Sequence, residues 1–399
     1  MTGLWTRDFL LFFIARFASL LGDVMLPVAI TAAVIEAGYG AEGVGYALAA
    51  QVAPFAALLI FGGVLSDRFG ARRLMVIADA ARLVCQGALA LLFLLGRPEL
   101  WQILALMALT GAGGAVFQPG VASVTPRIAR DVQKANATLG VAQSVTTVVG
   151  PSLAGLLLAF ASPGWVVACD GATFAVSGVC LLMVRSVSMT GAGGGAAKSL
   201  GLDLIEGWRE FRARTWLWSV IVLWMVLQLS SWGPTLTLGY STLVTDHGAS
   251  VFGLIMSAFG VGNVLGGLVA LRLRPEYPLR AATLAVSVYV LMPLAVAVGL
   301  SASLVAVCFA IGGAGLAFWS VMFHTSVQTL IPQHVLGRVH AYDAAGSLVM
   351  LPVGQAIAAP VAVVLGTVPV LVTAAGMGLV VCALLLAVPA VRNLRRADG

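Results

Sequence analysis

The stretch Gly63-Val64-Leu65-Ser66-Asp67-Arg68-Phe69-Gly70-Ala71-Arg72-Arg73 places four charged residues between two long apolar runs. Glycine adopts turn conformations that other residues avoid, so Gly70 permits a tight hairpin, and Gly63 lets another backbone approach closely. Asp67 lies at the expected end of a helix, where a carboxylate needs a cation or a helix N-terminus as its partner. Arginines in short loops resist translocation, so this hairpin is predicted at the cytoplasmic face of a membrane.

The composition supports a membrane protein. The chain has 399 residues, of which 60% are apolar and 10% charged, and its mean hydropathy is +1.02. A soluble domain carries about 25% charged residues. The net charge of +6 comes from basic residues in short loops, not from a patch interleaved with aromatics, so no nucleic-acid partner is expected. The five cysteines lie in apolar segments without metal-ligand spacing, and no metal site is predicted.

Apolar runs of about 20 residues mark membrane-spanning helices. The sequence predicts an all-α integral membrane protein with about twelve of them, six in each half of the chain. They are expected near 9–35, 43–65, 74–95, 100–121, 135–160, 165–184, 216–240, 251–271, 281–300, 304–330, 339–364 and 368–388.

The distribution of Lys and Arg predicts the orientation. Of the 22 such residues, nineteen fall in loops on one side and only Arg97 on the other, while Arg16 and Arg82 lie within spans. Because basic loops remain in the cytoplasm, both termini are predicted to be cytoplasmic, in a multi-pass protein of the cell membrane.

The chain divides into three parts: a first six-helix bundle at 1–187, a cytoplasmic linker at 188–214 and a second six-helix bundle at 215–399. The linker begins with a glycine-rich tether and continues with apolar residues at a spacing of three, which indicates an amphipathic helix. Thr125-Pro126 before the fifth span corresponds to Ile331-Pro332 before the eleventh, as expected for two pseudo-symmetric bundles. We expect a monomer.

The hairpin resembles the signature loop of the major facilitator superfamily, G-x-L-A-D-R-x-G-R-K. Matching residues are Gly63, Leu65, Asp67, Arg68, Gly70 and Arg72, whereas Ala71 departs from the pattern. In that family the aspartate contacts the start of the eleventh helix when the cytoplasmic side is closed. The resemblance therefore implies a conformational latch made of Gly63, Asp67, Arg68, Gly70 and Arg72.

The fifth span carries a helix-packing motif, Gly150, Pro151 and Gly155. Proline bends the helix and the glycines leave a smooth face, for which Gly262 and Gly266 in the eighth span are a candidate partner. The motif resembles an element of the drug/proton antiporter branch. Softer resemblances at 12–23, 117–119 and 170–174 point to the branch with macrolide-efflux proteins and enterobactin exporters. The arginine motif often seen in the fourth span of drug antiporters is missing.

Charged residues inside the spans each need a reason, since a charge near the bilayer centre costs about 2.5–3.5 kcal/mol. Asp23, two helical turns from Arg16, is the acid nearest mid-depth of the first span and is predicted to couple transport to protons. Burial disfavours its charged form, and Arg16 would favour it. Alternatively, Asp23 only pairs with Arg16 or binds a cationic substrate. Asp79 and Arg82 are predicted to pair with each other, and Asp170 is interpreted as an end-of-helix or packing group.

The polar and aromatic residues within the spans predict a roomy, weakly polar cavity. Its candidates are Phe117, Gln143, Trp224, Gln228, Trp319, His324 and Gln355. No nucleotide loop, zinc helix or nucleophile elbow is present in the sequence, so neither an enzyme nor a cofactor is expected. Together with the resemblance, this predicts a proton-driven exporter of a small lipophilic or amphipathic compound. Transport of a hydrophilic metabolite and a non-transport receptor are the alternatives.

Overall fold

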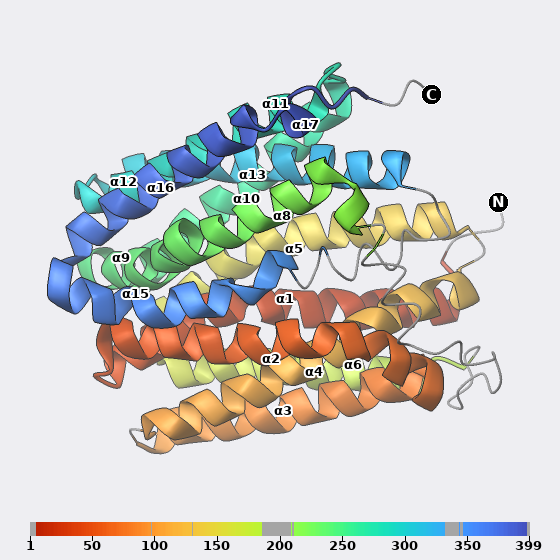
Figure 1. The fold of residues 1–399 in the computed structure, drawn as a ribbon. Coiled ribbons are helices and arrows are strands. Elements are labelled where there is room, and N and C mark those ends of the chain that lie inside the picture. The colour runs from red at the N-terminus through yellow and green to blue at the C-terminus, as the bar shows by residue number, and fades with distance from the viewer. Residues whose placement is uncertain are drawn as a thin grey trace. The chain divides into compact units, whose positions relative to one another are not determined.

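The structure is a computed structural model that describes residues 5–96, 98–129, 131–185, 209, 211–331, 343 and 346–396. For residues 60–68 it describes the backbone alone. Within these ranges every regular element is a helix (Figure 1). The all-α prediction is confirmed. The predicted linker at 188–214 and its amphipathic helix lie mostly outside the described residues.

Long helices joined by short turns make up the first half. They are α1 (Arg7–Glu36), α2 (Gly40–Phe69), α3 (Ala71–Leu95), α4 (Leu100–Ile128), α5 (Val132–Phe160) and α6 (Pro163–Met183). Gly70 is the one residue between α2 and α3, and its φ of +86° lies in the region that favours glycine. A hairpin this tight therefore depends on the absence of a side chain at Gly70.

The second half contains more broken helices. Its elements are α8 (Thr215–Leu227), η1 (Gln228–Trp232), η2 (Thr235–Gly239), α9 (Tyr240–His247), α10 (Ala249–Arg272), α11 (Pro278–Val286), η3 (Ser287–Val290), α12 (Leu291–Ala297), α13 (Ala302–Leu330), α15 (Leu351–Leu365), α16 (Thr367–Ala387) and α17 (Pro389–Arg392). The wide π-helical turns η1 and η2 flank Pro234. Proline removes a helical hydrogen bond, and a local change in winding is the usual response.

Twelve helices in the described residues are long and apolar enough to cross a membrane, which confirms the predicted number. The fourth span was predicted to end at 121 but ends at Ile128, and the seventh was predicted to end at 240 but continues to His247. Its extension carries Asp246 and His247, whose polarity hides the end of the helix from a count of apolar residues.

Contacts divide the chain into two units, Met1–Gly195 with Val244–Ser257, and Ala196–Leu243 with Ala258–Gly399. In the first unit, α1 packs against α5 and α6, α3 packs against α4 and α6, and α2 packs against α4. Glycine permits the closest of these approaches: a Cβ on Gly111 of α4 would lie 1.9 Å from the carbonyl oxygen of Gln51 on α2.

In the second unit, α13 packs against α11 and α12, while α16 packs against α8, α12 and α15. Gly262 and Gly266 on α10 lie against the backbone of Ala310 and Ala314 on α13. The predicted pairing of these two glycines with the fifth span is therefore wrong. Small residues on α13 offer the same smooth surface as those on α5, and local sequence does not distinguish them.

Candidate functional site

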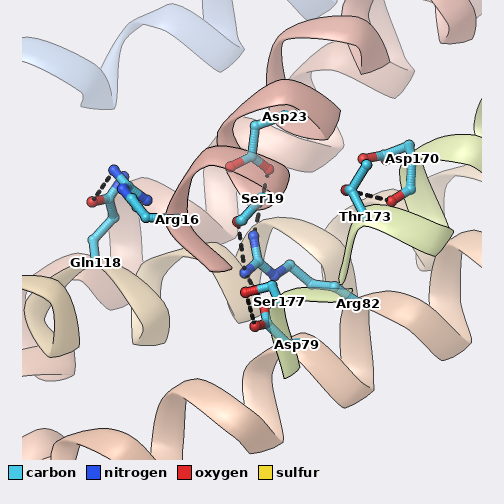
Figure 2. Close-up of polar contacts among 9 residues, drawn as sticks. All are labelled: Arg16, Ser19, Asp23, Asp79, Arg82, Gln118, Asp170, Thr173 and Ser177. Carbon is cyan, nitrogen blue, oxygen red and sulfur yellow. Dashed lines mark hydrogen bonds and ion pairs between the residues drawn. The ribbon is translucent and has the colours of Figure 1, made fainter. Parts of the chain in front are cut away.

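A cluster of charged side chains lies inside the first unit, centred on Arg82 of α3 (Figure 2). Arg82 forms ion pairs with Asp79, one turn earlier on the same helix, and with Asp23 of α1, whose Oδ1 lies 3.4 Å from Nη1. Nη2 of Arg82 also lies 3.4 Å from Oγ of Ser19. One guanidinium thus joins two carboxylates from different helices.

Aromatic rings and a hydroxyl complete the surroundings of Arg82. The guanidinium carbon lies 4.7 Å from the ring centre of Phe117 on α4 and 4.1 Å from that of Phe174 on α6. Such cation–π contacts stabilise a desolvated cation. Ser177 of α6 donates a 2.6 Å hydrogen bond to Oδ2 of Asp79. Four helices therefore supply the groups that hold this arginine in place.

The two acids paired with Arg82 differ in exposure. The Asp79 side chain is 0% exposed, whereas that of Asp23 is 37% exposed. Asp23 lies on the wall of a cavity of about 280 Å³, which Arg16, Gln51, Phe117 and other residues of α1 to α4 also line. Of the acids in this cluster, Asp23 is the one that the cavity reaches.

The hydrogen-bond partner of Arg16 is Gln118, not Asp23. Its Nη2 donates a 3.3 Å hydrogen bond to Oε1 of Gln118 on α4, and its guanidinium carbon lies 5.8 Å from the ring of Phe117. Sequence spacing had associated Arg16 with Asp23 and treated Asp79 and Arg82 as a separate pair. The structure joins Asp23 to Arg82, 59 residues along the chain.

The second unit has a cavity of its own, of about 480 Å³, whose lining includes the aromatic side chains of Trp224, Trp319 and Phe323. The rings of Trp224 and Trp319 stack with their centres 5.2 Å apart at 6°, and Phe323 stacks on Trp319 at 6.1 Å. His324 and Asp343 add polar groups to the wall. Apolar and aromatic surfaces combined with a few polar groups are typical of small-molecule pockets.

The three glutamines predicted to line a cavity are not among the residues around these two. Gln228 donates a 2.9 Å hydrogen bond to the carbonyl of Ser347, and Gln355 is buried in α15. Gln143 lies on an exposed face of α5. Amides in helices serve packing as readily as ligand binding, so composition did not separate these roles.

The helix-packing motif lies on α5, with Pro151 inside the helix. A Cβ on Gly150 would lie 2.3 Å from Cγ2 of Val24 on α1. A Cβ on Gly155 would lie 2.7 Å from the carbonyl oxygen of Ser250, in the part of α10 that belongs to the first unit. Both glycines therefore allow close helix contacts.

The predicted latch is described only in part. The side chains of Asp67 and Arg68 are not described, and the predicted start of the eleventh span lies outside the described residues. Arg72 donates hydrogen bonds of 2.8 and 2.6 Å to the carbonyls of Leu181 and Leu182 at the end of α6. A cation there satisfies free carbonyls and complements the helix dipole.

Among the described residues, no group of three or more His, Cys, Asp or Glu side chains could hold a metal ion.

A third carboxyl group, Asp170 of α6, is 0% exposed and lies near the cluster (Figure 2). The sequence interpretation treated it as an end-of-helix or packing group, because it lies nearer the outer end of the sixth span.

Comparison with known proteins agrees with this architecture. Residues 12–350 match the Major Facilitator Superfamily. Macrolide efflux protein A of Enterococcus faecalis is 23% identical over 313 residues, covering 74% of this chain and 94% of that protein. The enterobactin exporter EntS of Escherichia coli is 24% identical over 386 residues, covering 94% and 89%. The crystal structure of the nucleoside transporter NupG superposes with a TM-score of 0.77 at 12% identity, covering 96% and 99%.

Among the described residues, twelve helices long and apolar enough to cross a membrane, together with the family match, are those of a membrane transporter. The chain belongs to the Major Facilitator Superfamily, which confirms the resemblance seen in the hairpin.

Proposed function

We propose that this protein exports a small lipophilic or amphipathic compound across the cell membrane in exchange for protons. The observation that carries the proposal is the pairing of Asp23, which a cavity reaches, with the buried Arg82. The stacked aromatic cavity of the second unit supports a lipophilic substrate. Similarity to macrolide and enterobactin exporters supports the direction of transport.

Asp23 is the proposed proton-coupling residue. When ionised, it is held by Arg82; when it takes up a proton from the cavity, this attraction is lost and the contact between α1 and α3 loosens. Proton binding would thereby favour a different helix arrangement, as coupling requires. Arg16, close to the same cavity, is proposed to adjust the charge there through its contact with Gln118.

A hydrophilic substrate is the second candidate, because the cavity of the first unit is lined by three charged side chains, Arg16, Asp23 and Arg82. The two candidates differ in the expected substrates. An efflux-deficient bacterium that expresses the protein should resist lipophilic compounds, and a protonophore should abolish the resistance. Resistance to none of a broad lipophilic panel, with uptake of a polar metabolite instead, would favour the second candidate.

The coupling role is tested on purified protein. Substrate addition should release protons from the wild type but not from Asp23→Asn, which should still bind substrate. Asp131→Asn is the matched control: this exposed acid pairs with Lys134 at the start of α5, outside the span. Proton release from Asp23→Asn at the wild-type level would exclude Asp23.

Orientation and assembly complete the proposal. The excess of Lys and Arg in alternate loops supports cytoplasmic termini, and we propose a monomer as the working unit. Labelling of single cysteines at each end, in intact cells and in broken cells, tests the orientation.

A further inference from the structure

The helices α3 and α6 pack side by side and bring matching residues together at three levels. At the first level Ser177 donates a hydrogen bond to Asp79, and at the second the Phe174 ring lies against the guanidinium of Arg82. At the third, Gln86 lies beside Gly171, since a Cβ on that glycine would be 3.4 Å from Cβ of Gln86. The levels are about one helical turn apart, or roughly 5.4 Å.

Asp170 lies at the third level without a partner. Its side chain is fully buried, and neither carboxyl oxygen has a hydrogen-bond partner among the described residues. The bond drawn to Thr173 in Figure 2 involves only the main-chain carbonyl of Asp170. A Cβ on Gly22 of α1 would lie 2.2 Å from Oδ1, so the carboxyl group is packed directly against α1. Both amide atoms of the neighbouring Gln86 also have no partner in the described residues.

The surrounding charges do not compensate an ionised Asp170. Asp23 of α1 and Arg82 of α3 are the charged groups that interact electrostatically with Asp170. Asp79 and Arg16 are the other charged groups of the cluster, and Lys134 at the start of α5 is the sole charged residue of that helix. Arg82 is already shared by two carboxylates, and Arg16 contacts Gln118. A buried carboxylate without donors or a free cation is strongly disfavoured relative to the neutral acid.

We propose that Asp170 is a second proton-binding site of the transporter, protonated in this conformation, and that it alternates with Asp23 as the carboxylate held by Arg82. The inference rests on the proposed proton-coupled function for its role in transport. The protonation of Asp170 itself rests only on burial and missing partners.

The alternation requires Arg82 to move by one level. Phe174, whose ring lies against the Arg82 guanidinium, is four residues from Asp170 on the same face of α6. When a proton binds Asp23, Arg82 loses that partner and can turn toward Asp170. Asp170 then ionises, and its proton passes to water that enters as the contact between α1 and α3 loosens. One proton is gained at Asp23 and one is lost from Asp170, so the net charge of the cluster is unchanged. In the reverse step Asp23 releases its proton to the cavity before Asp170 takes one up, so the proton release on substrate addition is transient.

Infrared difference spectroscopy of the purified protein tests the protonation state, because a protonated carboxyl group has a carbonyl stretch separate from the carboxylate bands. The wild type at neutral pH should show this band, and Asp170→Asn should lack it. Asp131→Asn should keep it, since a hydrogen bond from the backbone N–H of Lys134 holds the pKa of Asp131 below its usual range. Identical bands in the wild type and Asp170→Asn would overturn the proposal.

A second variant tests the alternation. Asp23→Asn imitates the protonated state of Asp23 and frees Arg82, so the Asp170 band should weaken or vanish at the same pH. An unchanged band in Asp23→Asn would overturn the exchange of Arg82. Neither measurement uses a substrate, so a failure of the export hypothesis, seen in resistance assays, is distinguishable from a failure here. Asparagine has the size of a neutral aspartic acid, so Asp170→Asn should fold with an unchanged melting temperature.

Discussion

Replacing Arg82 by glutamine removes the cation that Asp23 and Asp79 share. The Arg82 side chain is 2% exposed and that of Asp79 is 0% exposed, so water does not replace the lost charge. Asp79 keeps the hydrogen bond from Ser177 but no ion pair. Removing one partner of a buried ion pair costs about 3–5 kcal/mol.

The free energy of protonating Asp79 sets an upper limit to the stability lost in Arg82→Gln. Adding a proton at pH 7 to a carboxyl group with an ordinary pKa of about 3.9 costs about 4 kcal/mol, at about 1.36 kcal/mol per pH unit. The buried Asp79 must meet this cost, whereas Asp23, with 37% of its side chain exposed, can stay hydrated. At pH 5 the same proton uptake costs about 1.5 kcal/mol. The destabilisation should therefore shrink between pH 7 and pH 5, by at most about 2.7 kcal/mol.

The assay is unfolding of the purified protein in detergent micelles, comparing the wild type with Arg82→Gln at both pH values. Adding Asp79→Asn to Arg82→Gln should recover most of the lost stability, since no buried charge then remains. Arg73→Gln, an exposed arginine on the same helix, is the control. A loss below about 1 kcal/mol at pH 7, typical of solvated ion pairs, or an equal loss at both pH values, would refute this account of the cluster.

Three further variants test packing and the hairpin. Gly155→Leu should lower the free energy of unfolding by about 1–3 kcal/mol, because it overpacks a close helix contact. Gly140→Ala on the same helix is the control: a Cβ there meets nothing within 4 Å, so the free energy of unfolding should rise by up to about 1 kcal/mol. Equal melting temperatures of the two variants would contradict this. Arg72→Ala should lose about 1.5–3 kcal/mol per charged hydrogen bond to α6, measured against Arg73→Ala, and equal stabilities would exclude those bonds as a support. Asp67→Asn should insert and fold normally but shift the balance of inward-open and outward-open states, read by the accessibility of engineered cysteines; wild-type accessibility and transport would remove the latch.

The sequence alone determined the spans and the family. Hydrophobicity over about 20 residues is a local property that lipid solvation imposes on each span separately. The hairpin motif is equally local, because a turn of one glycine and its flanking charges lies within eleven consecutive residues. The prediction went wrong at the ends of the fourth and seventh helices, where polar residues continue the span, and for Gly262 and Gly266, whose partners are Ala310 and Ala314.

The predicted pair of Asp79 and Arg82, one turn apart on α3, is confirmed. The partners that charged side chains find on other helices were decided by the tertiary structure alone. Asp23 and Arg82 are 59 residues apart, and Asp79 and Ser177 are 98 apart. No periodicity on one helix records such pairs, since they depend on which faces of α1, α3 and α6 meet. The same packing leaves Asp170 fully buried without a partner. The local sequence around a carboxyl group in an apolar helix does not show whether that group has a partner. The side chains of the neighbouring helices determine this.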